Sequence, residues 1–209
     1  MLPMIAIAGA YEDFFQAIQN NDGKAVSTLL QRGIDPNTPN PQLVPALLVA
    51  IQSKAEAAIS ALLKAPSLNV NAANDQDETP LMLAALNGNL ALVKELVDMD
   101  AAVNKPGWTP LHYAATYGHD EIVRFLLEEN AYIDAEAPNK TTPLMMAARL
   151  RLRTTAKLLV TEGADPTIVN MAGYNAAKFA REAGDVELAD WLERQGTDFR
   201  VKHGLPLNP

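Results

Sequence analysis

Residues 109–119 read TPLHYAATYGH, and the pattern of this stretch recurs along the chain. The tripeptide Thr-Pro-Leu occurs again at residues 79–81 and 142–144, and every copy leads into an Ala-Ala pair. Measured from the first alanine of each pair, the copies lie 30 and 33 residues apart. A period in this range is typical of a repeat protein, in which small units stack because none buries its apolar face alone.

Three weaker copies extend the series in both directions. Their aligned alanines are Ala17, Ala50 and Ala180, each 33 or 34 residues from the next copy. The sequence therefore predicts a repeat domain over residues 11–196. We expect six units, at about 11–43, 44–77, 78–107, 108–140, 141–173 and 174–196.

The fourth unit indicates how each unit folds. Thr109 suits the N-cap of a helix and Pro110 its first turn, while Gly118 suits its end. Beyond the glycine, apolar residues at positions 122, 123, 126 and 127 have the spacing of a second helix with one buried face. We therefore expect two short helices in each unit. Their small alanines let the first helices of neighbouring units approach closely.

These motifs resemble the ankyrin repeat, whose consensus runs Thr-Pro-Leu-His-x-Ala-Ala, Gly-His, a Val/Ile-Val-x-x-Leu-Leu helix and Gly-Ala-Asp. The fourth unit matches the first two motifs over residues 109–119, and residues 163–165 supply the last. The resemblance covers nearly nine tenths of the chain. It implies an all-α solenoid of six stacked helix-turn-helix repeats with short hairpin connections, as in a small stand-alone bacterial protein of this family.

Several segments depart from the pattern. The connection at residues 103–108 is three residues shorter than its neighbours, which predicts a blunted hairpin. Arg151 stands where the third and fourth units have glycine. The first and last units are more polar, as expected of caps at exposed ends. Residues 197–209 are predicted to form a flexible tail.

Residues 1–10 read MLPMIAIAGA and form a separate apolar segment. The triplet Ala6-Ile7-Ala8 before Gly9 resembles the end of a secretory signal peptide with its cleavage site. The positive charges that begin such a peptide are missing, and an apolar tail packing on the first helix is the alternative. The triplet favours export to the bacterial periplasm, with the cytoplasm as the alternative location.

The composition narrows the function. Of 209 residues, 48 % are hydrophobic, which is enough to bury a core. The net charge of −8 repels phosphate backbones, so nucleic acid is not an expected partner. No apolar run has the roughly 18 residues that span a bilayer. The absence of cysteine excludes disulfides, thiolate metal sites and a cysteine nucleophile.

Residues suited to catalysis or metal binding are sparse. His112 and His119 match positions where the ankyrin family has a structural histidine, and His203 stands alone in the tail. There is no glycine-rich phosphate loop and no nucleophile elbow. The acidic residues 74–78 lack the glycine and distal glutamate of a calcium loop. We therefore expect no catalytic residue, no cofactor and no metal.

The resemblance implies binding of a protein partner on the concave side, formed by hairpin tips and first helices. Trp108 could instead cover the gap beside the short connection, and the arginines from Arg149 to Arg153 could be either a solvated helix end or a site for an acidic segment. We expect a monomeric, non-enzymatic interaction module; the alternative is an exported envelope scaffold or protective protein without a single high-affinity client. The implied partner-binding residues are Glu78, Leu86, Asn87, Trp108, Thr116, Tyr117, Thr141, Arg149 and Leu150.

Overall fold

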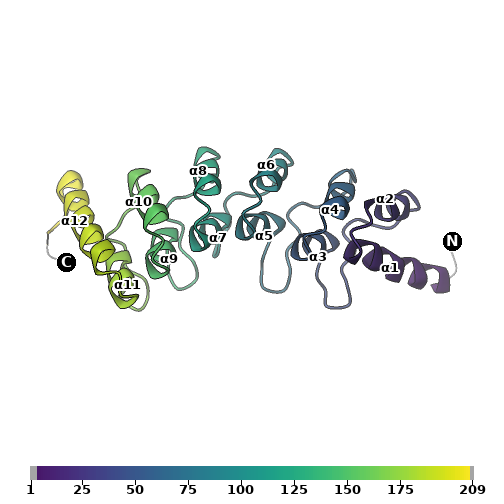
Figure 1. Cartoon of the computed structure of the whole chain (residues 1–209), viewed down its shortest axis with the longest axis horizontal. Helices are drawn as coiled ribbons and strands as arrows, with labels where there is room; N and C mark the ends of the chain where they lie inside the picture. The colour runs from purple at the N-terminus through teal and green to yellow at the C-terminus, as the bar shows by residue number, and fades with distance from the viewer. Residues whose placement is uncertain (1–3, 208–209) are drawn as a thin grey trace. The chain divides into compact units, whose positions relative to one another are not determined.

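The computed structural model describes the backbone of residues 4–207 and the side chains of residues 9–207. Over this range the chain is all α, without a regular strand (Figure 1). Its helices are α1 Met4–Gln19, α2 Gly23–Gln31, α3 Ala46–Gln52, α4 Glu56–Leu63, α5 Pro80–Leu86, α6 Leu90–Asp98, α7 Pro110–Tyr117, α8 Asp120–Glu128, α9 Pro143–Arg149, α10 Arg153–Thr161, α11 Ala176–Glu182 and α12 Val186–His203.

The chain divides into two compact units. Unit 1 comprises Met1–Ala84 and Glu95–Ala101, and unit 2 comprises Ala85–Lys94 and Ala102–Pro209. In unit 1, α1 packs on α2 and α3, and α4 packs on α2 and α3. In unit 2, the first helices α7, α9 and α11 are neighbours in that order, with α8, α10 and α12 forming a second layer (Figure 1). Within each unit the predicted all-α solenoid of helix-turn-helix repeats is confirmed.

The alanine pairs lie on the buried faces of the first helices. The pairs at residues 84–85, 114–115 and 147–148 are all 0 % exposed. Larger apolar side chains fill the space between the two layers of helices, including Leu47 and Leu62 in unit 1 and Leu111 and Leu126 in unit 2. Small side chains at the helix contacts and large ones between the layers therefore form one continuous core in each unit.

The Thr-Pro-Leu motif begins each of its helices as predicted. The Thr142 Oγ1 accepts a hydrogen bond from the Met145 backbone N–H at 3.4 Å, and the Thr79 Oγ1 accepts one from the Met82 N–H at the same distance. The proline that follows each threonine lies in the first turn of α5, α7 and α9, where a missing N–H costs nothing.

Side chains that follow the second helices link each repeat to the next. Asn37 accepts from the Asn69 backbone N–H at 2.7 Å and donates to the Ser67 carbonyl at 2.8 Å. Asn104 forms the same pair of bonds in unit 2, at 2.8 Å each, with residues 132 and 130. Asp134 takes this place in the next repeat, and both of its oxygens accept from the Asp165 N–H at 3.1 Å.

The connections between repeats project from the first-helix side as short loops, here called fingers. Four of them close with a backbone hydrogen bond, over residues 40–44, 74–78, 137–141 and 170–174. The predicted short connection turns at Gly107, which has a φ of +83°.

The structure changes the expected ends of the repeat domain. Helix α1 is continuous from Met4, so the predicted boundary at residue 10 lies inside it. Residues 1–3, and the side chains of Ala6-Ile7-Ala8, are outside the described part. Helix α12 continues to His203 and is capped by Gly204 at φ +66°, so residues 197–203 are helical and not a flexible tail. None of the described helices is both long and apolar enough to span a membrane.

Candidate functional site

The residues expected to bind a partner are divided between the two units. Glu78 belongs to unit 1, and the other eight belong to unit 2. Four of them gather at the C-terminal ends of α7 and α9, two helices that pack side by side. We call these four the helix-end surface, which consists of Thr116, Tyr117, Arg149 and Leu150.

His112 fixes the start of α7 and links it to the next repeat. Its Nδ1 accepts from the Thr109 backbone N–H at 3.2 Å and from the Thr109 Oγ1 at 2.9 Å, so the proton lies on Nε2. The Nε2 then donates to the Thr141 carbonyl at 2.9 Å. The ring is fully buried, and this burial lowers the pKa of His112 to about 4. The structural role expected of His112 is therefore confirmed.

His119 is the second structural histidine. Its Nε2 lies 3.0 Å from the Leu86 carbonyl and donates to it, which links α8 to the end of α5. Its ring also fills the space beside Gly88, where an added Cβ would come within 2.6 Å of the His119 Cε1. On the other side the ring stacks with Tyr117, at 6.3 Å between centroids and 13° between planes. One face of the tyrosine ring is therefore held by His119, while the rest of the ring is exposed to solvent.

Trp108 is half-buried because its ring packs edge-on against His112, with the centroids 5.2 Å apart. This contact covers the first turn of α7 beside the short connection. Part of the indole is therefore structural, and only its remaining surface is free for a partner.

The helix-end surface presents two apolar groups and one cation to solvent. Tyr117 is 54 % exposed and Leu150 is 44 % exposed, and they occupy equivalent positions 33 residues apart. Arg149, at the last position of α9, is exposed as well. Thr116 is half-buried, since its hydroxyl donates to the His112 carbonyl at 2.7 Å.

The remaining predicted residues contribute less surface. Leu86 and Asn87 are half-buried at the end of α5. Glu78 is also half-buried, and its Oε2 accepts from the Asn74 Nδ2 at 2.8 Å. Thr141 is only 4 % exposed, because its carbonyl accepts from His112 and its side chain faces Asn170. Thr141 therefore offers little surface to a partner, in contrast to what the sequence led us to expect.

The arginines of the fifth repeat have different roles. Arg153 donates to Asp185 with Nε at 2.7 Å and Nη2 at 2.6 Å, and its Nη1 donates to Glu187 at 2.6 Å. This hydrogen-bonded guanidinium lowers the pKa of Asp185. Arg153 is thus a structural link between α10 and the start of α12, which sequence reasoning missed because the partner lies 32 residues away. Arg149, Arg151 and Arg153 are all exposed, but the guanidinium of Arg153 is held by the carboxylates of Asp185 and Glu187.

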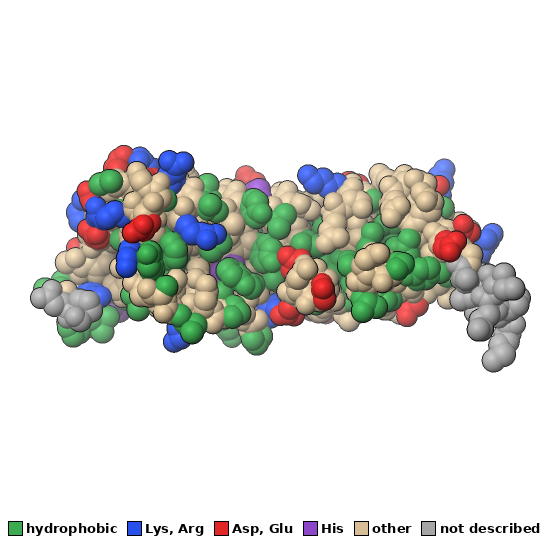
Figure 2. Space-filling model, turned by 90° about the horizontal axis from the view of Figure 1, so that it is seen from below, with side chains coloured by type: hydrophobic (Ala, Val, Ile, Leu, Met, Phe, Trp, Pro, Cys, Tyr) green, Lys and Arg blue, Asp and Glu red, His purple; other side chains and the backbone are tan. Residues whose placement is uncertain are grey.

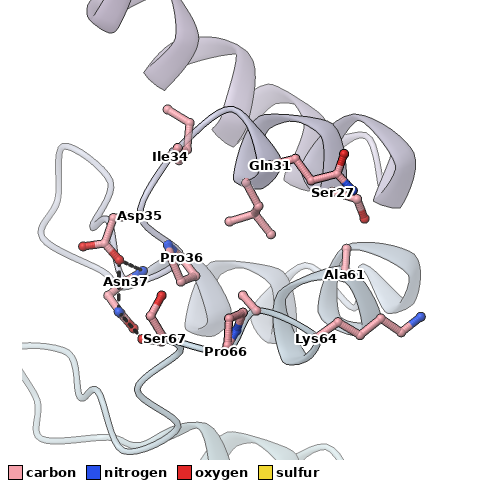
Figure 3. Close-up of a pocket in the computed structure, with 13 residues that line it drawn as sticks. Ser27, Gln31, Ile34, Asp35, Pro36, Asn37, Ala61, Lys64, Pro66 and Ser67 are labelled. Carbon is pink, nitrogen blue, oxygen red and sulfur yellow. Dashed lines mark hydrogen bonds between the residues drawn. The ribbon is translucent and has the colours of Figure 1, made fainter. Parts of the chain in front are cut away.

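A groove in unit 1 has a volume of about 660 Å³ and lies between α2, α4 and the loops that follow them (Figure 3). Among its polar side chains, Asn37 is engaged with Asp35 at 3.0 Å and with the Ser67 carbonyl at 2.8 Å. Comparable grooves lie in unit 2 between α8 and Glu162 and between α10 and α12. Because the groove recurs with different side chains, we interpret it as the seam between second helices.

No arrangement suited to metal binding is present in the described residues: nowhere among them do three or more His, Asp or Glu side chains converge. His203 hydrogen-bonds the Phe199 carbonyl at 2.8 Å within α12.

Comparisons with known proteins match the geometry. A family model for ankyrin repeats (three copies) matches residues 14–106, 47–137 and 99–170. The ankyrin repeat protein YahD of Escherichia coli is 29 % identical over 197 residues, covering 88 % of this chain and 96 % of that protein. The crystal structure of an ankyrin repeat domain from Acinetobacter baumannii aligns with a TM-score of 0.75 at 25 % identity, over 88 % of this chain and 97 % of that one.

Other relatives are much longer. The rat ankyrin repeat and SAM domain-containing protein 6 is 44 % identical over 78 residues, which are 35 % of this chain and 9 % of that protein. The glycerophosphocholine phosphodiesterase gde1 of Schizosaccharomyces pombe is 32 % identical over 158 residues, 71 % of this chain and 14 % of that protein. Each match thus spans a small part of the relative. The word phosphodiesterase in the second name refers to the whole yeast protein and is not carried over to this chain.

Proposed function

Because this chain belongs to the ankyrin repeat family, we propose that it is a non-enzymatic module that binds a protein partner through the first-helix side of its repeats. Ankyrin repeats are in general protein–protein interaction modules. The family gives the class of function, and the side chains of this chain must supply the specificity.

One observation carries the proposal: Tyr117 and Leu150 are exposed on adjacent helix ends beside Arg149. Tyrosine and arginine are enriched among the side chains that dominate interface energies, because each combines a large contact area with polar groups. Tyr117 loses little conformational freedom on binding, since its ring already stacks on His119. A partner covering about 800 Å² would bury these groups together.

The test is a pull-down of the partner from the native cell with the double variant Tyr117→Ala and Arg149→Ala. We expect the partner to be lost while the far-ultraviolet circular dichroism and the melting temperature stay within error. A matched control is Arg124→Ala with Tyr132→Ala, which removes the same two side-chain types from the second-helix side of unit 2; Tyr132 is 70 % exposed. Unchanged binding by the first variant, or equal loss by both, contradicts the proposal.

A further inference from the structure

The first finger carries an unusual leucine. Among the described residues, eight non-glycine residues have a positive φ: Asn21, Leu43, Lys54, Asp77, Asp100, Asn130, Lys140 and Arg151. Leu43 is the apolar one of the eight, with a φ of +61° and 72 % of its surface exposed. Leucine lacks the short polar side chain that makes the left-handed conformation tolerable for asparagine and aspartate. This residue therefore combines backbone strain with apolar exposure.

The tip around Leu43 is tightly hydrogen-bonded. The Asn40 Oδ1 accepts from the backbone N–H groups of Gln42 at 3.0 Å and Val44 at 2.9 Å. The Asn40 backbone also donates to Val44 and accepts from Leu43, both at 2.9 Å. Tyr11 of α1 donates its hydroxyl to the Pro39 carbonyl at 2.6 Å, which fixes the base of the finger. The leucine is therefore presented on a rigid loop.

Other fingers place different residues at this position. The residue equivalent to Leu43 is Asp77 in the second finger (residues 74–78), Lys140 in the finger at residues 137–141 and Gly173 in the finger at residues 170–174, with φ values of +62°, +61° and +72°. A charged side chain there exposes no large apolar surface, and glycine carries no strain. Leu43 is thus the tip residue whose exposure and conformation are both unfavourable in the free chain. Strain of this kind at an exposed position points to a contact with another molecule.

The electrostatics around the tip indicate the kind of molecule. In the described part of unit 1, first helices and fingers carry only acidic charges, while the basic residues lie on α2, on α4 or in the turns at their ends. Figure 2 shows red side chains beside green ones over the N-terminal part of this side, with the blue ones at its edges. The acidic residues on the first helices and finger tips are Glu12, Asp13, Asp75, Asp77 and Glu78, and the basic residues of unit 1 are Lys24, Arg32, Lys54 and Lys64.

We infer that the fingers of unit 1 form a second docking surface, on which Leu43 inserts into an apolar recess of a basic protein segment. The carboxylates on α1 and on the second finger attract and orient that segment, while burial of Leu43 supplies the anchor. The inference rests on the proposed function in one respect, that the chain binds protein. It goes beyond the proposed function in the surface, which lies in unit 1, and in specifying the partner segment as basic.

Site-specific photocrosslinking in the native cell tests the inference. The photoreactive residue p-benzoylphenylalanine replaces Leu43 in one strain, Leu150 in a second and Tyr132 in a third, and the crosslinked segments are identified by mass spectrometry. We expect position 43 to crosslink to a segment rich in Lys and Arg, and position 132 to serve as the background. A crosslink from 43 to an acidic or neutral segment overturns the inference. A crosslink from 150 without one from 43 overturns it while leaving the proposed function intact, and the absence of both overturns the two together.

Variants of the purified chain give a second measurement, with the partner segment that the crosslink identifies. Asp75→Lys with Asp77→Lys should weaken binding at least tenfold, whereas Glu95→Lys with Asp98→Lys, an equal change on exposed residues of α6, should weaken it less than twofold. Leu43→Asn should weaken binding at least tenfold without lowering the melting temperature, because asparagine tolerates a positive φ. Equal effects of the two charge pairs, or a drop in melting temperature with Leu43→Asn, contradict the inference.

Discussion

Replacing Asp134 by asparagine should stabilise the protein at neutral pH and change how its stability depends on pH. Asp134 occupies a position that Asn37 and Asn104 hold in other repeats, where the amide both accepts and donates between repeats. The ionised carboxylate of Asp134 accepts from the Asp165 N–H but has no proton to donate. Asparagine at this position restores the donor and removes the buried charge.

The size of the effect follows from the pKa. Burial, with a smaller contribution from the facing charge of Asp165, raises the pKa of Asp134 from 3.8 to about 6. Such a shift corresponds to about 3 kcal/mol, which solvent screening at a half-buried position reduces to about 1–2 kcal/mol. A raised carboxyl pKa gives stability that is fully present below about pH 4 and is lost as the pH rises through about 6. We therefore expect Asp134→Asn to be more stable by about 1–2 kcal/mol at pH 7.5 and nearly neutral at pH 4.

The assay is urea unfolding followed by circular dichroism at several pH values between 4 and 7.5. Asp198→Asn on α12 is the matched control, because it makes the same change at an exposed position of unit 2. The quantity compared is the difference in the free energy of unfolding between pH 4 and pH 7.5. If this difference is the same in Asp134→Asn as in the unchanged chain, the assigned burial of the carboxylate charge is wrong.

Three further predictions concern the scaffold of unit 2. His112→Gln should cost about 1–2 kcal/mol at pH 7.5 through lost hydrogen bonds, as measured by urea unfolding. Because the folded pKa of His112 is lowered to about 4, the stability it gives is lost as pH falls from 6.5 towards 4, and the variant should lack this acid sensitivity; an unchanged pH profile contradicts the assignment. Gly88→Ala should destabilise by about 1–3 kcal/mol, and by more than Gly184→Ala, because both glycines have positive φ but only the first would meet a neighbouring side chain; equal losses in melting temperature refute the steric argument. Arg153→Lys should lower the melting temperature, since lysine cannot make the two-pronged bond to the buried Asp185, and an unaltered melting curve shows that the pair is dispensable.

Much of the fold could be predicted from the sequence because its signals are local and repeated. Each signal depends on residues within about one helical turn: the Thr-Pro-Leu caps, the alanine pairs and the apolar spacing of the second helices. The common period also made the weaker copies of the motif recognisable. The end of α12 could not be predicted in this way: the prolines beyond residue 205 suggested a loose tail, whereas the helix stops at Gly204.

The candidate site was less predictable because burial depends on contacts between repeats. Thr141 precedes a helix as Trp108 does, yet His112 and Asn170 cover it from neighbouring repeats. Arg153 looks like one more surface arginine until the fold brings Asp185 to it. The strain at Leu43 had a weak local signal, an apolar residue in a proline-flanked turn, but its left-handed backbone appears only in three dimensions.

The hydrogen bonds of the two structural histidines have a consequence for how the molecule opens. His119 joins the fourth repeat to the end of α5, and His112 joins it to the fifth repeat at Thr141, so this repeat is bonded on both sides by side chains. In a nearly one-dimensional array of repeats, cooperative unfolding depends on the interactions between adjacent repeats. Local unfolding starts at the repeats where these interactions are weakest. The amides of α7 and α8 should therefore be among the last in unit 2 to exchange with deuterium, and the terminal pair α11 and α12 should exchange earlier. Repeats of nearly the same sequence are therefore expected to differ in local stability, and the fourth repeat, which carries Tyr117, is expected to open last in unit 2.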